Sequence, residues 1–296
     1  MVRIASLLVL AFVIGCGGGR SSGLCERVNI DDAKPGDVSA AESAAAAGWA
    51  KRADMKSAET AVAEWRKAVA IAPQKTDNYL RLAKALYFYA DGHLRFDEDR
   101  EEEMIKAFEE ATFFAERALQ IQNPDFQFSV CSREPFEKSV RKLRKADVPA
   151  VYWYAAALGK YGLAKSIVVV LDNKDRIYAM MKRVQKMAPE FHHGAADRYL
   201  GAFYTKIPFP KGDMRKSRGH FERSIKASPN YLATRVLVAE MLAPKLKDRA
   251  LFERSLKYVL DAPADIIPEL AAEHAIEKRK AALLMEDIDT YFAAEE

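Results

Sequence analysis

Three segments of this chain end in the same way, and this recurrence constrains the fold more than any other feature. In each segment a large apolar residue lies eight positions before a proline, and a small or short apolar residue lies five before it. The segments are Trp65–Pro73, Met181–Pro189 and Phe221–Pro229. The two marked positions are three residues apart, so they share one face of a helix. The proline then ends the helix and turns the chain.

The spacing of the prolines is that of a helical repeat. Pro189 and Pro229 are 40 residues apart, and Pro229 and Pro263 are 34 apart, periods typical of tetratricopeptide-like hairpins. The intervals from Pro73 to Pro124 and from Pro124 to Pro189 are longer. Abundant Ala, Glu, Lys, Leu and Arg favour helix. The sequence predicts an all-α fold of irregular tetratricopeptide-like helical-hairpin repeats forming one superhelical domain; a plain bundle with coincidental prolines is the alternative.

The first fifteen residues have the features of a lipoprotein signal peptide. Arg3 precedes an apolar stretch, Ile4–Ile14, that is too short for an ordinary transmembrane helix. The run Val13-Ile14-Gly15-Cys16 resembles the lipobox of bacterial lipoproteins. We expect cleavage before Cys16 and lipid, including palmitate-type acyl chains, on its thiol. An ordinary signal peptide with a chance cysteine is the alternative.

The sequence after Cys16 divides the mature chain into two parts. Gly17–Gly23 is rich in glycine and serine and predicts a flexible tether, and the stretch to Val38 is rich in turn residues. We therefore assign residues 1–15 to the signal peptide, 16–38 to the lipidated cysteine and tether, and 39–296 to the helical-repeat domain. The domain should lie on the periplasmic side of a membrane. Because Gly17 is not the aspartate that resembles an inner-membrane retention signal, we expect the outer membrane.

Two cysteines remain beyond the lipidated one. Cys25 and Cys131 form an even pair, and an oxidising compartment allows them to make a disulfide. Two free thiols are an equal alternative at this stage. Neither residue lies in a metal-ligand pattern such as CxxC.

Charge and motifs exclude several classes of function. The net charge of +4 is spread along the chain, so we do not expect nucleic-acid binding. No HExxH, Walker or GxGxxG motif occurs, and we predict no enzyme, no cofactor and no metal. His192 and His193 follow a proline turn, where a solvated loop or a helix start is a better interpretation than a metal site.

Two aromatic segments are the candidates for a ligand cavity. The helix predicted after Pro149 is apolar nearly all round, and such a helix is either central in the core or lines a cavity. The tyrosine and tryptophan tips need polar partners, which favours the cavity, and nearby lysines could meet an anion. Ordinary core packing and surface lysines are the alternative. The candidates are Tyr152, Trp153, Tyr154, Tyr161, Lys165, Tyr199, Phe203, Tyr204 and Phe209.

With its lipobox, the chain resembles the T component of TRAP transporters, the TatT-type periplasmic lipoproteins, over about residues 45–292. The segments that carry the resemblance are 149–166, 188–208, 211–230 and 268–292. The chain has Lys211-Gly212-Asp213 where the family typically has Gly-Gly-Asp. It has Glu273 and His274 where an asparagine is common.

The resemblance implies an accessory role in transport. It implies a homo-oligomer, with a trimer as the first expectation, that docks the substrate-binding P component of a TRAP system. It further implies cavities that bind or pass a small organic or hydrophobic ligand, with the aromatic helix 152–161 and the segment 199–208 as the matching positions. A helical-repeat adaptor that joins periplasmic proteins without ligand transfer is the alternative.

Overall fold

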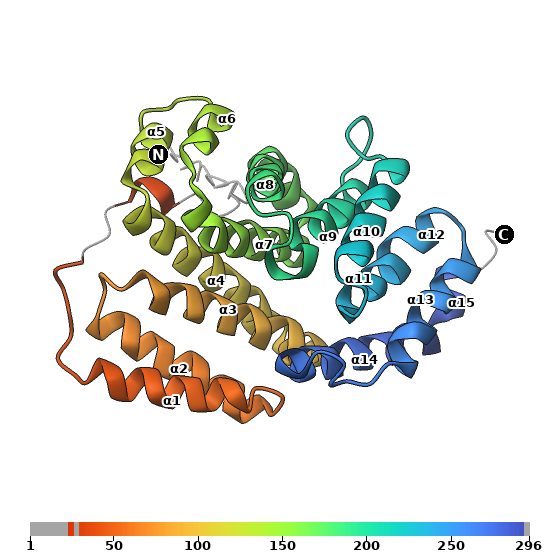
Figure 1. The fold of residues 1–296 in the computed structure, drawn as a ribbon, viewed down its shortest axis with the longest axis horizontal. Coiled ribbons are helices and arrows are strands. Elements are labelled where there is room, and N and C mark those ends of the chain that lie inside the picture. Colours follow the sequence, from red (N-terminus) through yellow and green to blue (C-terminus); the bar gives the residue numbers. More distant parts are fainter. Residues whose placement is uncertain (1–22, 27–29, 293–296) are drawn as a thin grey trace, which may run out of the picture.

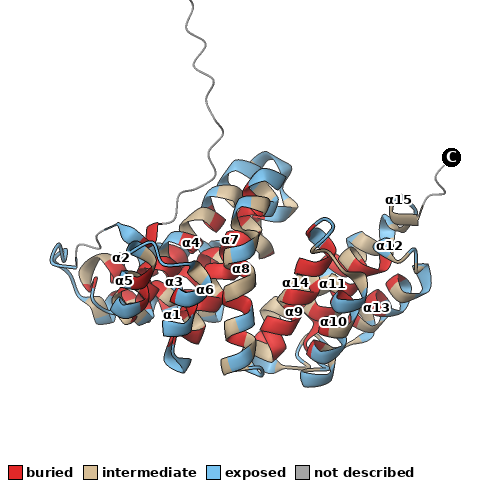
Figure 2. Cartoon of the chain, turned by 90° about the horizontal axis from the view of Figure 1, so that it is seen from above, coloured by how far each residue is buried: buried red, intermediate tan, exposed pale blue. Residues whose placement is uncertain are grey.

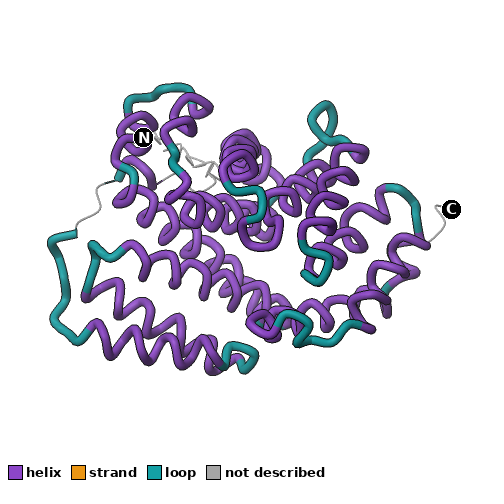
Figure 3. Tube along the Cα trace, viewed as in Figure 1, coloured by secondary structure: helices purple, strands orange, loops and turns teal. Residues whose placement is uncertain are grey.

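Helices account for most of the structure, a computed structural model that describes residues 23–26 and 30–292 (Figure 3). Within those residues no β-strand occurs, and the predicted all-α fold is confirmed. The helices are α1 (Val38–Ala50), α2 (Met55–Ile71), α3 (Thr76–Gly92), α4 (Glu101–Gln122), α5 (Pro124–Cys131), α6 (Phe136–Ser139), α7 (Val148–Lys165), α8 (Ile167–Met187), α9 (Phe191–Lys206), α10 (Met214–Ala227), α11 (Leu232–Leu237), α12 (Ala243–Lys245), α13 (Arg249–Asp261), α14 (Ala271–Glu286) and α15 (Ile288–Phe292).

The prolines end their helices at a constant position. Helices α2, α4, α8, α10 and α13 each stop two residues before a proline. The residue between is pushed out of the helical region, with ψ of 69° at Ala72, 71° at Ala188 and 78° at Ser228. A proline ring excludes the helical conformation at the preceding residue, which explains the shared endpoint.

Short polar side chains begin many of the helices. Asp37 accepts a hydrogen bond from Ala40 N at the start of α1, and Asp54 does the same for Ser57 N at the start of α2. The side chains of Asn123, Ser166, Asp213 and Asp248 cap α5, α8, α10 and α13. These caps satisfy amide groups that have no partner inside the helix. The starts of these helices are therefore determined by the local sequence.

Successive helices pack side by side and build a curved body (Figure 1). The chain pairs α1 with α2, α3 with α4, α7 with α8, and α9 with α10. The tetratricopeptide type of these pairs stays a prediction. Buried residues lie where neighbouring helices pack against one another, as the red segments of Figure 2 show.

Helix α14 returns to the first half of the chain although it lies near its end. Gly92, at the end of α3, has no side chain, and a Cβ there would overlap Ile276 of α14. Arg52, in the turn after α1, forms an ion pair of 2.6 Å with Glu273 and donates to the Glu269 carbonyl at 2.7 Å. Early and late segments therefore meet along α14.

Part of the segment predicted as the tether, Gly23–Leu24, is packed against the helices, whereas residues 30–37 are exposed. Leu24 is fully buried, and Gln120 of α4 donates to the carbonyl oxygens of Gly23 and Leu24. Cys25 and Cys131 form a disulfide with their Cα atoms 5.4 Å apart. The predicted lipidation site, Cys16, and the signal peptide lie outside the described residues. None of the described helices is both long and apolar enough to cross a membrane.

Candidate ligand-binding cleft

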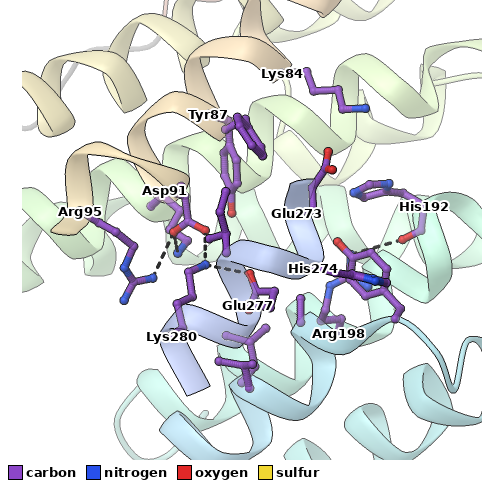
Figure 4. A pocket seen from close by; sticks show the side chains of 18 of the residues that line it. Lys84, Tyr87, Asp91, Arg95, His192, Arg198, Glu273, His274, Glu277 and Lys280 are labelled. Carbon is purple, nitrogen blue, oxygen red and sulfur yellow. Dashed lines mark hydrogen bonds and ion pairs between the residues drawn. The ribbon is translucent and has the colours of Figure 1, made fainter. Parts of the chain in front are cut away.

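A cleft lies where the two halves of the chain meet, and its first cavity has a volume of about 130 Å³. Helices α3, α7, α9, α11 and α14 surround it, together with the π turn Val238–Leu242 that joins α11 to α12. Figure 4 shows polar side chains from α3, α9 and α14 pointing into this space. They include Lys84, Tyr87, Asp91, His192, Arg198, Glu273, His274, Glu277 and Lys280.

A second cavity of about 110 Å³ adjoins the first. The two share five wall residues: Tyr87, Tyr152, Lys160, Arg198 and Leu237. Its remaining walls are mainly apolar side chains of α7, α8 and α9, including Val170, Ile177, Phe203 and Ile207. We treat the two adjoining cavities as one cleft. The first cavity is its polar part, and the second is its apolar part.

Gly159 leaves space for a tyrosine side chain in the wall of the second cavity. A Cβ at this position of α7 would overlap the hydroxyl group of Tyr199, which enters from α9. Both residues line the cavity. The absence of a side chain at Gly159 therefore allows a tyrosine to occupy the wall between α7 and α9.

Asp91 is the centre of an ion network at one end of the first cavity. Its carboxylate contacts Lys160 Nζ at 2.5 Å, Lys280 Nζ at 2.6 Å and Arg95 at 3.3 Å. Lys280 also contacts Glu277 at 2.8 Å. Burial opposes the ionised form of Asp91, but the three cations outweigh it and hold the pKa of the carboxyl well below its ordinary value. The network joins α3, α7 and α14.

The start of α9 is a left-handed turn at the other end of the cavity. His192, His193 and Gly194 have φ of 44°, 58° and 68°, a region that residues with a side chain rarely adopt. Arg198 donates to the carbonyl oxygens of His193 at 2.9 Å and His192 at 3.3 Å. Its guanidinium lies 4.2 Å from the ring centre of Tyr231. Strained backbone of this kind gathers at ligand sites.

The electrostatics of this end are positive. Arg198 is only 5% exposed and keeps its charge. Burial, followed by the charges of Arg198 and Lys84, holds the pKa of His192 well below its ordinary value, so the imidazole is neutral. Burial also raises the pKa of Tyr87, Tyr199 and Tyr231, which leaves neutral hydroxyl groups in the walls.

Residues 53–292 match the sequence model of the family described as TRAP transporter T-component. The chain belongs to this family. T-components are accessory proteins of a transport system and are not known enzymes. No curated protein matches the chain. The match runs from before α2 into α15, so it includes nearly every wall of the cleft of this T-component.

Four of the nine predicted cavity residues line the cleft. Tyr152 lines both cavities, Trp153 lines the first, and Tyr199 and Phe203 line the second. His192, interpreted from the sequence as solvated or at a helix start, does begin α9 but lies against the first cavity.

The other five predicted cavity residues line neither cavity, and three of them are buried in helix packing. Tyr154 accepts a hydrogen bond from Arg176 at 3.0 Å, Tyr161 is buried in the core, and Tyr204 bonds the Tyr178 hydroxyl at 3.2 Å. Lys165 is exposed at the end of α7, and Phe209 is 91% exposed in the loop after α9. Residue type alone could not separate them, because adjacent aromatics point in different directions around a helix.

The charged residues of α3 and α14 were missed by the sequence reasoning. A signal was present: Lys84, Tyr87 and Asp91 recur at helical spacing on α3, and Glu273, Glu277 and Lys280 do so on α14. Such stripes usually face solvent, so only the docking of α14 against α3 reveals them as one site. Within the described residues no cluster of three or more His, Cys, Asp or Glu could hold a metal ion.

Proposed function

We propose that this T-component binds a small organic ligand in its cleft and passes it between the transporter's substrate-binding P component and the membrane. Two adjoining cavities with five common wall residues support this proposal, because together they bring polar and apolar walls to one place in the fold. Ligand sites are typically concave, mostly apolar and supplied with a few converging polar groups. The left-handed turn held by Arg198 adds backbone strain at the same place.

Docking of the P component is the second part of the proposal. Leu163, Ile167 and Val168 are exposed apolar side chains at the junction of α7 and α8, and Leu163 also lines the second cavity. Exposed apolar groups beside a ligand cavity suit a protein partner better than water. We propose that the P component covers this junction and meets the cavity there.

The third part of the proposal concerns location and assembly. We propose that lipid on Cys16 anchors the chain on the periplasmic side of the outer membrane, and that the chain assembles as a homo-oligomer, with a trimer as the first expectation. The Cys25–Cys131 disulfide supports an oxidising compartment.

Capture of the P component in the native cell tests the docking. The tagged full chain should co-purify, after crosslinking, with a TRAP substrate-binding protein. Ile167→Asp with Val168→Asp should abolish this capture. Phe128→Asp is the matched control, since Phe128 is equally apolar and 73% exposed but lies on α5 and lines neither cavity. Equal loss in both variants, or capture of no P component by the parent, would contradict docking at this junction.

Acyl labelling and membrane fractionation test the anchor. Labelled palmitate should enter the parent chain and not Cys16→Ser, and the parent should co-sediment with outer-membrane markers. Label in the Cys16→Ser chain would refute the assignment of the lipid to Cys16, and sedimentation with the inner membrane would refute the address. Light scattering of the detergent-solubilised chain measures the oligomer, and a monomer would refute that part.

A further inference from the structure

We infer that the cleft binds an elongated amphipathic carboxylate, with the carboxylate head between Lys84 and Arg198 and the apolar chain in the second cavity. This inference rests on the ligand-binding part of the proposed function.

Pairing of the charges leaves two cations at the first cavity. Lys160, Lys280 and Arg95 all contact Asp91. Glu277 pairs with Lys280, Glu240 with Arg95, and Glu273 with Arg52 from outside the cavity, so these carboxylates are occupied. Of the described cations that line this cavity, Lys84 and Arg198 have no carboxylate within ion-pair distance. The Glu273 carboxylate, which pairs with Arg52, acts on Lys84 only through its longer-range charge.

Arg198 is the stronger of the two anion donors. It is almost completely buried, and carbonyl oxygens and the Tyr231 face are its main partners. A buried cation without an anion is costly, and carbonyl dipoles offset only part of that cost. The His192 and His193 carbonyls and the Tyr152 hydroxyl accept hydrogen bonds from Arg198, and its remaining N–H groups serve a ligand. A planar guanidinium held on an aromatic face is preorganised for a carboxylate.

Lys84 and Arg198 act on the same place. The charges of both residues depress the pKa of His192, and Figure 4 shows the His192 ring between their side chains. His274 of the facing helix α14 also lines this cavity. Two cations therefore act on the part of the first cavity beside His192, and an anionic head is the group that pairs with both.

The second cavity suits the chain of such a ligand. Arg198 and Tyr152 stand in the wall common to both cavities, so a head bound there directs its tail into the second. The tail would contact Val170, Ile177 and Phe203. Among the described residues that line this cavity there is no carboxylate, whereas Lys160, Lys174, Lys206 and Arg198 are cationic. An organic cation would thus be repelled, and a purely apolar ligand would leave Arg198 without an anion.

Calorimetric titration of the full chain carrying Cys16→Ser, in detergent-free buffer, tests the ligand class. The probes are octanoate, octan-1-ol, octyltrimethylammonium and butyrate. Octanoate should bind one per chain and about tenfold or more tighter than octanol, because only the carboxylate pairs with the two cations. Octyltrimethylammonium should not bind. Equal affinity for octanoate and octanol, or binding of the cation, would overturn the inference.

Variants of the head site and the tail site separate the two roles. Lys84→Gln and Arg198→Gln should each weaken octanoate about tenfold and leave octanol unchanged. Since Arg198 also holds the turn at His192, Lys84→Gln keeps the test independent of folding, and Lys56→Gln is the matched control on an exposed face of α2. Ala202→Phe should fill the second cavity and weaken octanoate but not butyrate. Unchanged octanoate affinity in Lys84→Gln would overturn the head assignment.

The two experiments distinguish a wrong ligand class from a wrong docking proposal. If no octyl compound binds while the chain still captures the P component, the ligand class is wrong and docking stands. If octanoate binds with the expected dependence on Lys84 but no P component is captured, the ligand site stands and the docking proposal fails.

Discussion

Neutralising Asp91 should destabilise the chain by about 3 kcal/mol. Removing one partner of a buried ion pair costs about 3–5 kcal/mol, because the remaining charge stays buried without compensation. Asp91→Asn belongs near the lower end: the Asp91 side chain is 16% exposed, and Lys280 keeps Glu277 as a second partner. Lys160, at 27% exposed, can recover part of its hydration. At about 2–4 °C per kcal/mol for a large domain, the melting temperature should fall roughly 6–12 °C.

Thermal unfolding followed by circular dichroism measures the effect of Asp91→Asn. Asp289→Asn is the control: its carboxylate also pairs with an arginine but is 89% exposed, and its melting temperature should match the parent's. A double-mutant cycle with Lys160→Met should give a coupling of about 1 kcal/mol or more. A fall in melting temperature of less than about 2 °C in Asp91→Asn, or zero coupling energy to Lys160, would refute the conclusion that this ion network holds α3, α7 and α14 together.

The pH dependence of the same difference has a definite sign. The pKa of Asp91 in the folded chain lies well below its ordinary value near 4. Its contribution is therefore complete above the unfolded pKa and is lost as the pH falls through the lowered folded pKa. The gap in stability between the parent and Asp91→Asn should be constant from pH 5 to 8 and close only in stronger acid.

Three further perturbations test other parts of the structure. Cys25→Ser with Cys131→Ser should cost about 2–5 kcal/mol in thermal unfolding, because the disulfide closes a loop across 106 positions; a melting temperature equal to the parent's would contradict this. The lowered pKa of His192 penalises protonation of the folded chain, so the free energy of unfolding of the parent should fall as the pH drops below about 6.5. His192→Asn should make this fall smaller, and asparagine tolerates the left-handed conformation. If denaturant titrations give the same slope of stability against pH in both chains, His192 is not a buried neutral imidazole. Gly159→Ala should destabilise the chain by about 1–3 kcal/mol through overlap with the Tyr199 hydroxyl, and Tyr199→Phe in the same chain should recover part of that loss; no recovery would exclude this contact as the cause.

Local signals in the sequence were sufficient for the class of fold. A proline at Pro73 or Pro189 excludes the helical conformation at one preceding residue, so helix ends can be located without tertiary information. Caps such as Asp54 and Asp213 fix the starts in the same way. The sequence also singled out α7 as unusual, and Tyr152 and Trp153 do reach the cleft.

The charged half of the site depends on long-range docking that no local pattern encodes. Asp91 and Lys280 are 189 positions apart, and Arg52 and Glu273 are 221 apart. Each looks like an ordinary solvated charge until α14 meets the end of α3. Tyr204 and Phe209 show the converse difficulty: their aromatic character favoured the cavity, but helix phase put Tyr204 against Tyr178, and the loop carried Phe209 into solvent.

The Asp91 ion network and the two remaining cations, Lys84 and Arg198, together predict that one substitution changes stability and ligand affinity in opposite directions. Asp91 neutralises part of the positive charge of Lys160, Lys280 and Arg95, so the surplus at the first cavity is confined to Lys84 and Arg198. Asp91→Asn should then weaken folding while tightening octanoate, because the cleft gains a positive charge close to the head site. A cavity that served only as loose packing would lose stability and ligand affinity together. Lower stability together with tighter octanoate binding would therefore show that the Asp91 network both holds the helices together and sets the net charge near the ligand.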